Sequence, residues 1–291
     1  MPRVPANGIE LEYEAFGHDS DPALVLIAGL GAQLIDWPAE FCEKLAAHGL
    51  RVIRFDNRDA GLSASLDSLG PPDLVAVLGG DHATVAYYLA DLAADTAGLL
   101  DALGIGQAHV VGVSMGGMIA QQFAIDHPGR LLSLCSMSST TGAPSVGQAT
   151  PVALAALGRP SAATRDEAIQ GSAASSRVFG SPGFPLSDEE RLARATTKYD
   201  RSYRPAGRLR QIAAIAASPD RTSGLHDITA PAVVVHGEAD PLVNVTGGRA
   251  TAAAIPAAEL VVIPGMGHDL PRGAWPQIID AIVGNVAKAA S

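Results

Sequence analysis

The 291-residue sequence is poor in cysteine and in long apolar runs. Its two cysteines, Cys42 and Cys135, are too few for a disulfide scaffold, and we expect both to be small buried side chains in a reducing compartment. No stretch approaches the roughly 20 apolar residues of a membrane span. Residues 1–12 lack the cationic and apolar regions of a signal peptide. These absences predict a cytoplasmic protein without a membrane span.

Positive charge is also scarce. Lysine and arginine total 20 against 30 aspartates and glutamates, so the formal net charge is −10. Because phosphate binding needs a basic face, nucleic acid is not an expected partner. Hydrophobic residues make up 47% of the chain, which is enough for a substantial core. The length allows one large α/β domain with an insertion, or two small domains.

Nucleotide and metal motifs are missing as well. The glycines at 112, 116 and 117, and those at 29 and 31, do not form G-x-G-x-x-G, so a Rossmann dehydrogenase is rejected, and no P-loop is present. His236, Glu238 and Asp240 form an H-x-E-x-D pattern, but the chain turns there and no fourth ligand is evident. We therefore expect no cofactor and no metal.

Strand-like and helix-like runs alternate along most of the chain. Strands are predicted at Ile9 to Phe16 (an edge strand), Leu24 to Ala28, Val52 to Phe55, His109 to Val113, Leu131 to Met137, Ala232 to His236 and Glu259 to Ile263. Helices are predicted at Phe41 to His48, Thr84 to Leu103, Met115 to His127, Gly247 to Ala254 and Trp275 to Ala289. This order predicts an α/β fold with a mostly parallel central sheet and helices on both faces.

The alternation of strands and helices stops between residues 142 and 228, where helical stretches are separated by proline and glycine and no buried strand is evident. We expect residues 1–141 and 229–291 to form the core and residues 142–228 to form a helical lid inserted before the last strands. The inserted segment has 11 basic and 8 acidic residues, net +3, so the remainder carries 9 minus 22, or −13. This charge fits either a solvated helical surface or a lid that attracts anionic substrates.

The most informative motif is Gly112-Val113-Ser114-Met115-Gly116. It lies between an apolar strand-like run and a helix-like run, which is the context of a G-x-S-x-G nucleophile elbow. Such an elbow lifts the serine oxygen above the sheet, and the helix N-terminus favours a developing anion there. Ser114 is therefore the candidate nucleophile.

A serine nucleophile needs a histidine base and a carboxylate that orients it. Asp240 follows the strand at 232–236, and His268 follows the strand at 259–263, in the chain order typical of this elbow. Parallel strands end at one edge of a sheet, so Ser114, Asp240 and His268 are predicted to meet there.

The alternatives to these residues are weaker. Glu238 is the alternative acid, but it is two residues closer to the strand. His109 and His127 fit structural roles in or beside buried elements. Asp269 fits a capping or surface residue better than a partner that perturbs the pKa of His268.

Acyl transfer also requires an oxyanion hole. One donor is expected to be the backbone N–H of Met115, directly after the nucleophile, and the other to come from the loop after the first buried strand. That loop is Ala28-Gly29-Leu30-Gly31-Ala32, and its spacing assigns the second donor to Leu30.

These motifs together resemble the α/β-hydrolase family. The resemblance rests on Gly29-Leu30-Gly31, the Asp56 to Ser63 turn, Gly-Val-Ser-Met-Gly-Gly-Met, the Asp240 turn and Pro264-Gly265-Met266-Gly267-His268. Within the family, the chain is similar to bacterial carboxylesterases of the aclacinomycin methylesterase type. The resemblance implies the same triad and oxyanion donors, and an apolar pocket bounded by a lid.

Candidate pocket residues are Gly29 and, in the inserted segment, Phe179, Phe184 and Tyr203. The last three fit a pocket lining or the small core of the lid itself. A small-molecule ester is the expected substrate, and a homodimer is left open.

The leading hypothesis is a serine carboxylesterase that works through an acyl-enzyme. A thioesterase and a cofactor-free haloperoxidase or perhydrolase share the triad, and a non-catalytic ligand receptor is the alternative from another class. A dehalogenase or an epoxide hydrolase would need aspartate at position 114.

Overall fold

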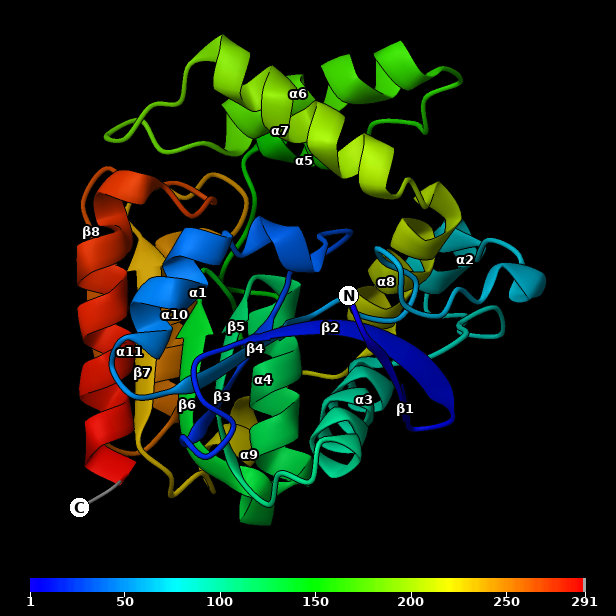
Figure 1. Cartoon of the computed structure of the whole chain (residues 1–291). Coiled ribbons are helices and arrows are strands. Elements are labelled where there is room, and N and C mark those ends of the chain that lie inside the picture. Colours follow the sequence, from blue (N-terminus) through cyan, green and yellow to red (C-terminus); the bar gives the residue numbers. More distant parts are fainter. Residues whose placement is uncertain (290–291) are drawn as a thin grey trace.

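The computed structural model describes residues 1–289, in which a central eight-stranded sheet lies between layers of helices (Figure 1). The strands are β1 (Arg3–Ala6), β2 (Ile9–Phe16), β3 (Ala23–Ile27), β4 (Arg51–Phe55), β5 (Ala108–Val113), β6 (Leu131–Met137), β7 (Ala232–Gly237) and β8 (Glu259–Ile263). Their order is β1-β2-β4-β3-β5-β6-β7-β8. The pairs β1–β2 and β2–β4 are antiparallel, and every other pair is parallel. This is the expected mostly parallel sheet.

Burial explains why the central strands are apolar throughout. Every residue of β3 and of β7 is buried, because helices cover both faces of the sheet there. The predicted edge position of Ile9–Phe16 is wrong, since β1 pairs outside β2 and forms the edge. The four residues of β1 include Pro5 and show no clear apolar period, so the sequence pattern missed this strand.

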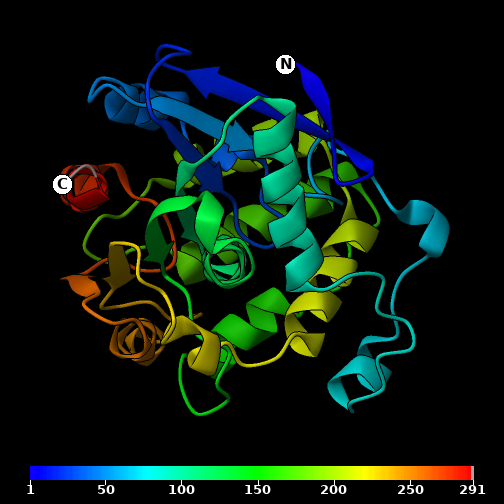
Figure 2. The ribbon, with the colours of Figure 1, turned by 90° about the horizontal axis from the view of Figure 1, so that it is seen from below.

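Two groups of helices cover the two faces of the sheet (Figure 2). One face packs on α3 (Leu89–Ala102), α4 (Met115–Asp126), α9 (Thr222–Leu225) and α10 (Val245–Ala254), and the other on α1 (Ala39–Ala46) and α11 (Trp275–Ala289). On the second face Phe41 meets the edge of Trp275, with ring centroids 5.5 Å apart.

The helix predicted at Thr84 to Leu103 begins later, at Leu89, where the side chain of Asp91 accepts a hydrogen bond from the Tyr88 amide. The short helix α2 (Leu74–Leu78) was not predicted. Four 3-10 turns complete the elements, at Leu34–Asp36, Asp67–Leu69, Pro128–Arg130 and Arg272–Ala274.

Residues 142–228, all of them described, contain helices and no strand. Besides α9, these are α5 (Pro151–Leu157), α6 (Arg165–Phe179), α7 (Asp188–Arg201) and α8 (Pro205–Ala217). Side chains of Thr150, Thr164 and Ser187 accept amide hydrogen bonds at the starts of α5, α6 and α7, which explains where these helices begin. Helices α5, α6 and α7 lie together above the sheet, whereas α8 packs on α2 at its side (Figure 1).

Buried ion pairs connect the helical segment to the loop after β4. Arg201 pairs with Asp56 at 2.7 Å, and Arg210 pairs with Asp59 at 2.6 Å. Both carboxylates are fully buried, so each requires its arginine. Within residues 1–289, no helix has the length and apolar character needed to cross a membrane.

Candidate active site

Ser114 lies at the turn between β5 and α4, with a backbone φ of 57°, which is strained for a residue with a side chain. The neighbouring glycines allow this turn to pack closely. A β-carbon at Gly112 would lie 1.9 Å from the carbonyl oxygen of Gly116, and one at Gly116 would lie 2.1 Å from that of Ile27. No other residue type fits either position. The backbone therefore has the geometry of a nucleophile elbow.

The structure brings together the three side chains predicted to meet. His268 Nε2 is 2.9 Å from Ser114 Oγ, and His268 Nδ1 is 2.7 Å from Asp240 Oδ2. The other carboxylate oxygen of Asp240 accepts hydrogen bonds from the amides of Leu242 and Val243, at 2.9 and 2.8 Å. These amides fix the orientation of the carboxylate.

The hydrogen-bond donors in this array follow from the chemistry of the groups. The Asp240 carboxylate only accepts, so the imidazole proton is on Nδ1 and is donated to Asp240. Nε2 of a neutral imidazole is then an acceptor, and the hydroxyl of Ser114 donates to it. The array can take a proton from Ser114 while the carboxylate stabilises the charged imidazole.

The neighbouring acid and histidine do not replace Asp240 and His268, although His236 Nε2 lies 3.6 Å from Asp240 Oδ2. Glu238 is exposed, whereas Asp240 is buried beside His268. His236 is fully buried and donates from Nε2 to the carbonyl of Val243, at 2.8 Å. Burial lowers the pKa of His236, which favours its neutral form. His236 therefore supports the loop after β7 from inside the core.

Leu30 and Met115 present free amides beside Ser114. Among the described residues neither amide donates a hydrogen bond to the protein, and that of Met115 is the first of α4. Gly29 lies against the serine, because a β-carbon there would be 3.3 Å from Ser114 Cβ and 3.8 Å from Oγ. The loop after β3 thus runs directly past the hydroxyl.

A buried glutamine holds this loop in place. Gln211, on α8, accepts a hydrogen bond from the amide of Gly31 at 2.8 Å and donates to the carbonyl of Arg58 at 2.9 Å. The Gly31 amide is therefore occupied, unlike that of Leu30. No local sequence signal pointed to Gln211, since 180 residues separate it from Gly31.

Ser114 and His268 open into a cavity of about 780 Å³, which extends under α5, α6, α7 and the start of α8. Gly29, Phe179 and Tyr203 line it, as do Leu30 and Met115. The ring of Phe179 meets that of His268 edge-on, with centroids 6.5 Å apart. Phe184 lies outside this lining and packs against the core on the side of α1 and α11.

The loop that carries His268 is attached to the segment after α6. The amide of His268 donates to the carbonyl of Phe179 at 2.7 Å, and Ser181 Oγ accepts from the Gly267 amide at 2.8 Å. The same hydroxyl donates to the carboxylate of Asp269. Asp269 is half-buried and bound to Ser181 instead of lying free at the surface, and burial raises the pKa of its carboxyl.

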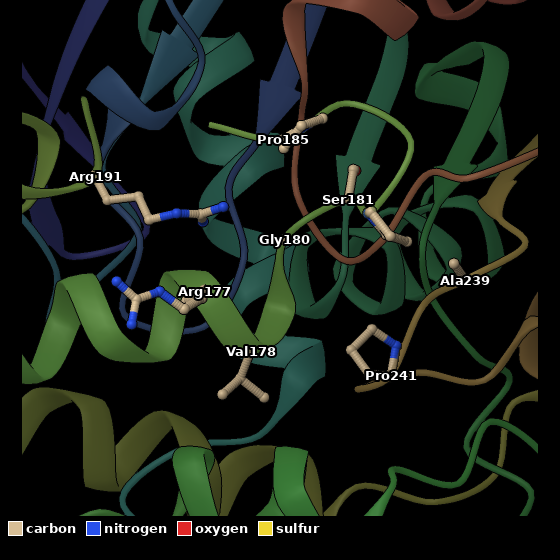
Figure 3. Close-up of a pocket in the computed structure, with 9 residues that line it drawn as sticks. Arg177, Val178, Gly180, Ser181, Pro185, Arg191, Ala239 and Pro241 are labelled. Atoms are coloured by element: carbon tan, nitrogen blue, oxygen red, sulfur yellow. The ribbon is translucent and has the colours of Figure 1, made fainter. Parts of the chain in front are cut away.

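A smaller cavity of about 330 Å³ lies beside this segment (Figure 3). Arg177, Ser181 and Arg191 are among the residues that surround it. Arg191 also lines the larger cavity, so the two spaces adjoin.

Both cysteines and His109 are buried and lie outside the site. Burial raises the pKa of Cys42 to about 12 and that of Cys135 still further, so both remain thiols. His109 contacts Ser133 Oγ at 2.8 Å inside the sheet.

The fold and this serine, histidine and aspartate array match one family. The family model of the α/β-hydrolase fold matches residues 22–271, and the chain belongs to that family.

Two relatives are similar over nearly their whole length. Rhodomycin D methylesterase DauP of Streptomyces sp. (strain C5) is 30% identical, with 98% of each chain covered. Rhodomycin D methylesterase DnrP of Streptomyces peucetius is 29% identical, with 97% of this chain and 96% of the relative covered. The enzyme class expected from the sequence, a carboxylic ester hydrolase, agrees with the family and with both relatives.

A solved structure supports the fold. The crystal structure of an esterase, RhEst1 from Rhodococcus sp. ECU1013, has a TM-score of 0.74 at 21% identity. The comparison covers 99% of this chain and 98% of that one. At this identity the likeness concerns the fold alone.

Proposed function

We propose that this chain hydrolyses carboxylic esters through a covalent acyl-enzyme formed on Ser114. The observation that carries the proposal is the continuous hydrogen-bonded path from Ser114 Oγ through His268 to Asp240, at 2.9 and 2.7 Å. These distances are within the range for direct proton transfer. The family and the two methylesterase relatives support ester hydrolysis independently of this geometry.

In the first step, Ser114 Oγ attacks the ester carbonyl carbon and its proton moves to His268 Nε2. The carbonyl π electrons move to oxygen and give a tetrahedral oxyanion. The carboxylate of Asp240 stabilises the imidazolium and keeps Nε2 directed at the serine. Collapse of the intermediate expels the alkoxide, which takes the proton from His268 and leaves as an alcohol.

The amides of Leu30 and Met115 are the proposed oxyanion donors. Neither donates a hydrogen bond within residues 1–289; Met115 directly follows Ser114, and Gly29, the residue before Leu30, packs against the serine. Loss of one such donor typically raises the barrier by about 2.7–4 kcal/mol. Gln211 contributes indirectly, because its hydrogen bond to Gly31 holds the loop that carries Leu30.

In the second step, water attacks the acyl-enzyme and His268 takes its proton. The second tetrahedral intermediate collapses to the carboxylic acid, and Ser114 recovers its proton from His268. No cofactor or metal takes part in this scheme.

Residues 142–228 are the proposed lid, and residues 1–141 and 229–291 the catalytic core. Helices α5 to α8 supply much of the wall of the cavity into which Ser114 opens. A substrate held there is surrounded by Phe179, Tyr203 and their neighbours, with its carbonyl against Ser114. Methyl esters are the proposed first substrates to test, on the likeness to the two methylesterases.

The experiment compares wild type with Ser114→Ala and Asp240→Asn on p-nitrophenyl acetate and on a simple methyl ester. Wild type is expected to hydrolyse at least the activated ester, and Ser114→Ala to lose roughly 10⁴-fold or more in kcat. Exposed Ser68, whose hydroxyl makes no hydrogen bond within residues 1–289, provides the matched control Ser68→Ala. Undiminished hydrolysis by Ser114→Ala would refute the proposal.

A further inference from the structure

Arg208 is a half-buried cation in the wall of the catalytic cavity. Its Nη2 donates to the carbonyl of Leu157 at 2.5 Å, which is the one hydrogen bond that its side chain makes to the described part of the chain. A guanidinium has five N–H donors, and a neutral carbonyl does not balance its charge. Burial lowers the pKa of Arg208, which reflects the cost of holding this charge away from water.

Two arginines close to Arg208 in the sequence are balanced by carboxylates. Arg201 is paired with Asp56, and Arg210, two residues after Arg208, is paired with Asp59. No carboxylate within residues 1–289 lies within salt-bridge distance of Arg208. Of these three buried or half-buried arginines, Arg208 is thus the one that faces the cavity without an anionic partner.

The position of Arg208 on its helix adds to the uncompensated positive charge in this region. The residue lies one turn into α8, and Arg204 is the residue that precedes this helix. The first turn of α8 has no acidic residue. Because the N-terminal end of a helix is already positive, two cations there are unfavourable unless an anion is nearby. This region of the cavity is therefore suited to bind an anion.

Acidic side chains in the cavity wall do not supply that anion. Each of the four is already engaged by another group, namely Asp36 by Lys198, Asp59 by Arg210, Glu167 by the amides before α6, and Asp269 by Ser181. A ligand is left as the source of a partner for Arg208.

Arg208 is also close to the reacting serine. A β-carbon at Gly31 would lie 3.2 Å from Arg208 Cδ, and one at Gly29 would lie 3.3 Å from Ser114 Cβ. These two glycines are separated by one residue, so their α-carbons are at most about 7.6 Å apart. Ser114 and Arg208 thus flank the same short loop and line the same cavity, so one ligand lying along the loop can contact both.

We propose that the cavity takes an ester that also carries a carboxylate, and that Arg208 binds this carboxylate. This inference rests on the proposed ester hydrolysis and assigns the substrate class of the same site. Arg208 is a specificity-determining residue, since its planar fork can hold a carboxylate through two parallel hydrogen bonds. The reacting ester group is then held against Ser114 while the anion is held at the start of α8.

The first test uses wild type and esters of one chain length that differ in the charge of the far end. Monomethyl adipate is negative, methyl hexanoate is neutral and methyl 6-aminohexanoate is positive. A parallel arm places the anion on the alcohol, with the acetyl ester of 6-hydroxyhexanoate against hexyl acetate. In one of the two arms we expect kcat/KM of the anionic ester to be at least roughly tenfold higher than that of the neutral ester, mainly because its KM is lower. This preference for the anionic ester should decrease as the salt concentration rises.

The second test uses Arg208→Gln and Arg208→Lys, with exposed Arg249→Gln as the matched control. Arg208→Gln is expected to reduce the anionic-to-neutral ratio of kcat/KM to about one, and Arg208→Lys to restore part of it. Arg249→Gln is expected to keep the wild-type ratio.

Hydrolysis of the neutral esters without an anionic preference in either arm would overturn the inference and leave the esterase proposal standing. An unchanged ratio in Arg208→Gln would also overturn it. Loss of all ester hydrolysis in wild type would instead refute the proposed function.

Discussion

The hydroxyl of Ser181 donates a hydrogen bond to the carboxylate of Asp269, which directly follows His268. The same hydroxyl accepts from the amide of Gly267, so one side chain of the helical segment holds both neighbours of the histidine. The segment after α6 therefore both bounds the cavity and fixes the loop that carries His268.

Replacement of Ser181 by alanine is expected to loosen that loop. Both hydrogen bonds of the hydroxyl are lost and the half-buried carboxylate of Asp269 loses its hydroxyl donor, so His268 samples orientations away from Ser114. We expect kcat to fall by about tenfold with little change in KM, because positioning acts on the chemical step. Steady-state kinetics on p-nitrophenyl acetate measure both constants. A rise in KM with unchanged kcat would show that Ser181 acts on substrate binding instead.

Replacement of Gly116 by alanine is expected to disrupt the elbow. The new β-carbon would lie 2.1 Å from the carbonyl oxygen of Ile27, so strand and helix must separate. We expect a loss of about 3 kcal/mol or more in the free energy of unfolding, with loss of activity. Gly106→Ala is the matched control, since nothing lies within 4 Å of its β-carbon, and it should change stability by less than about 1 kcal/mol. Equal urea midpoints for the two variants would contradict this account.

The pair between Arg210 and Asp59 is expected to be needed for stability. Both side chains are almost completely buried, so Arg210→Met leaves an uncompensated carboxylate and should cost about 3–5 kcal/mol. Adding Asp59→Asn should recover part of that loss. The exposed pair of Arg165 and Asp200 gives the control, because Arg165→Met should cost less than about 1 kcal/mol. Urea unfolding of wild type, Arg210→Met, Asp59→Asn, the double variant and the Arg165→Met control measures this, and strict additivity of the two core substitutions would contradict it.

Stability should fall in mild acid through His109. Burial lowers its pKa from 6.5 to about 4, so the unfolded chain binds a proton near pH 6.5 that the folded chain binds only near pH 4. The stability contributed by neutral His109 is thus present above pH 6.5 and is lost as the pH falls towards 4, by about 2 kcal/mol between pH 7 and pH 5. Urea unfolding of His109→Gln at both pH values should show a smaller loss than wild type. The exposed His48→Gln should show the wild-type loss, and the same loss in all three would contradict the assignment.

Much of the site could be predicted because its residues follow strands. Parallel strands end at one edge, so the positions of Ser114, Asp240 and His268 after β5, β7 and β8 were enough to predict that they meet. The buried apolar strands were equally clear, since β6 and β8 have the predicted limits.

Contacts between distant segments could not be predicted in the same way. Gln211 meets Gly31 across 180 residues, and Ser181 meets Asp269 across 88, without any local pattern. Phe184 is an apolar residue of the helical segment like Phe179, but only the packing directs one to the core and the other to the cavity. The missing anionic partner of Arg208 is recognised only once the ion pairs of Arg201 and Arg210 are known.

The most direct measurement is mass spectrometry of the protein quenched in acid during turnover of p-nitrophenyl acetate. The account predicts a single acetyl group on the peptide that contains Ser114 in wild type. It predicts no acetyl group and no turnover in Ser114→Ala. Turnover by wild type without acetylation of that peptide, together with continued hydrolysis by Ser114→Ala, would contradict the proposed acyl-enzyme.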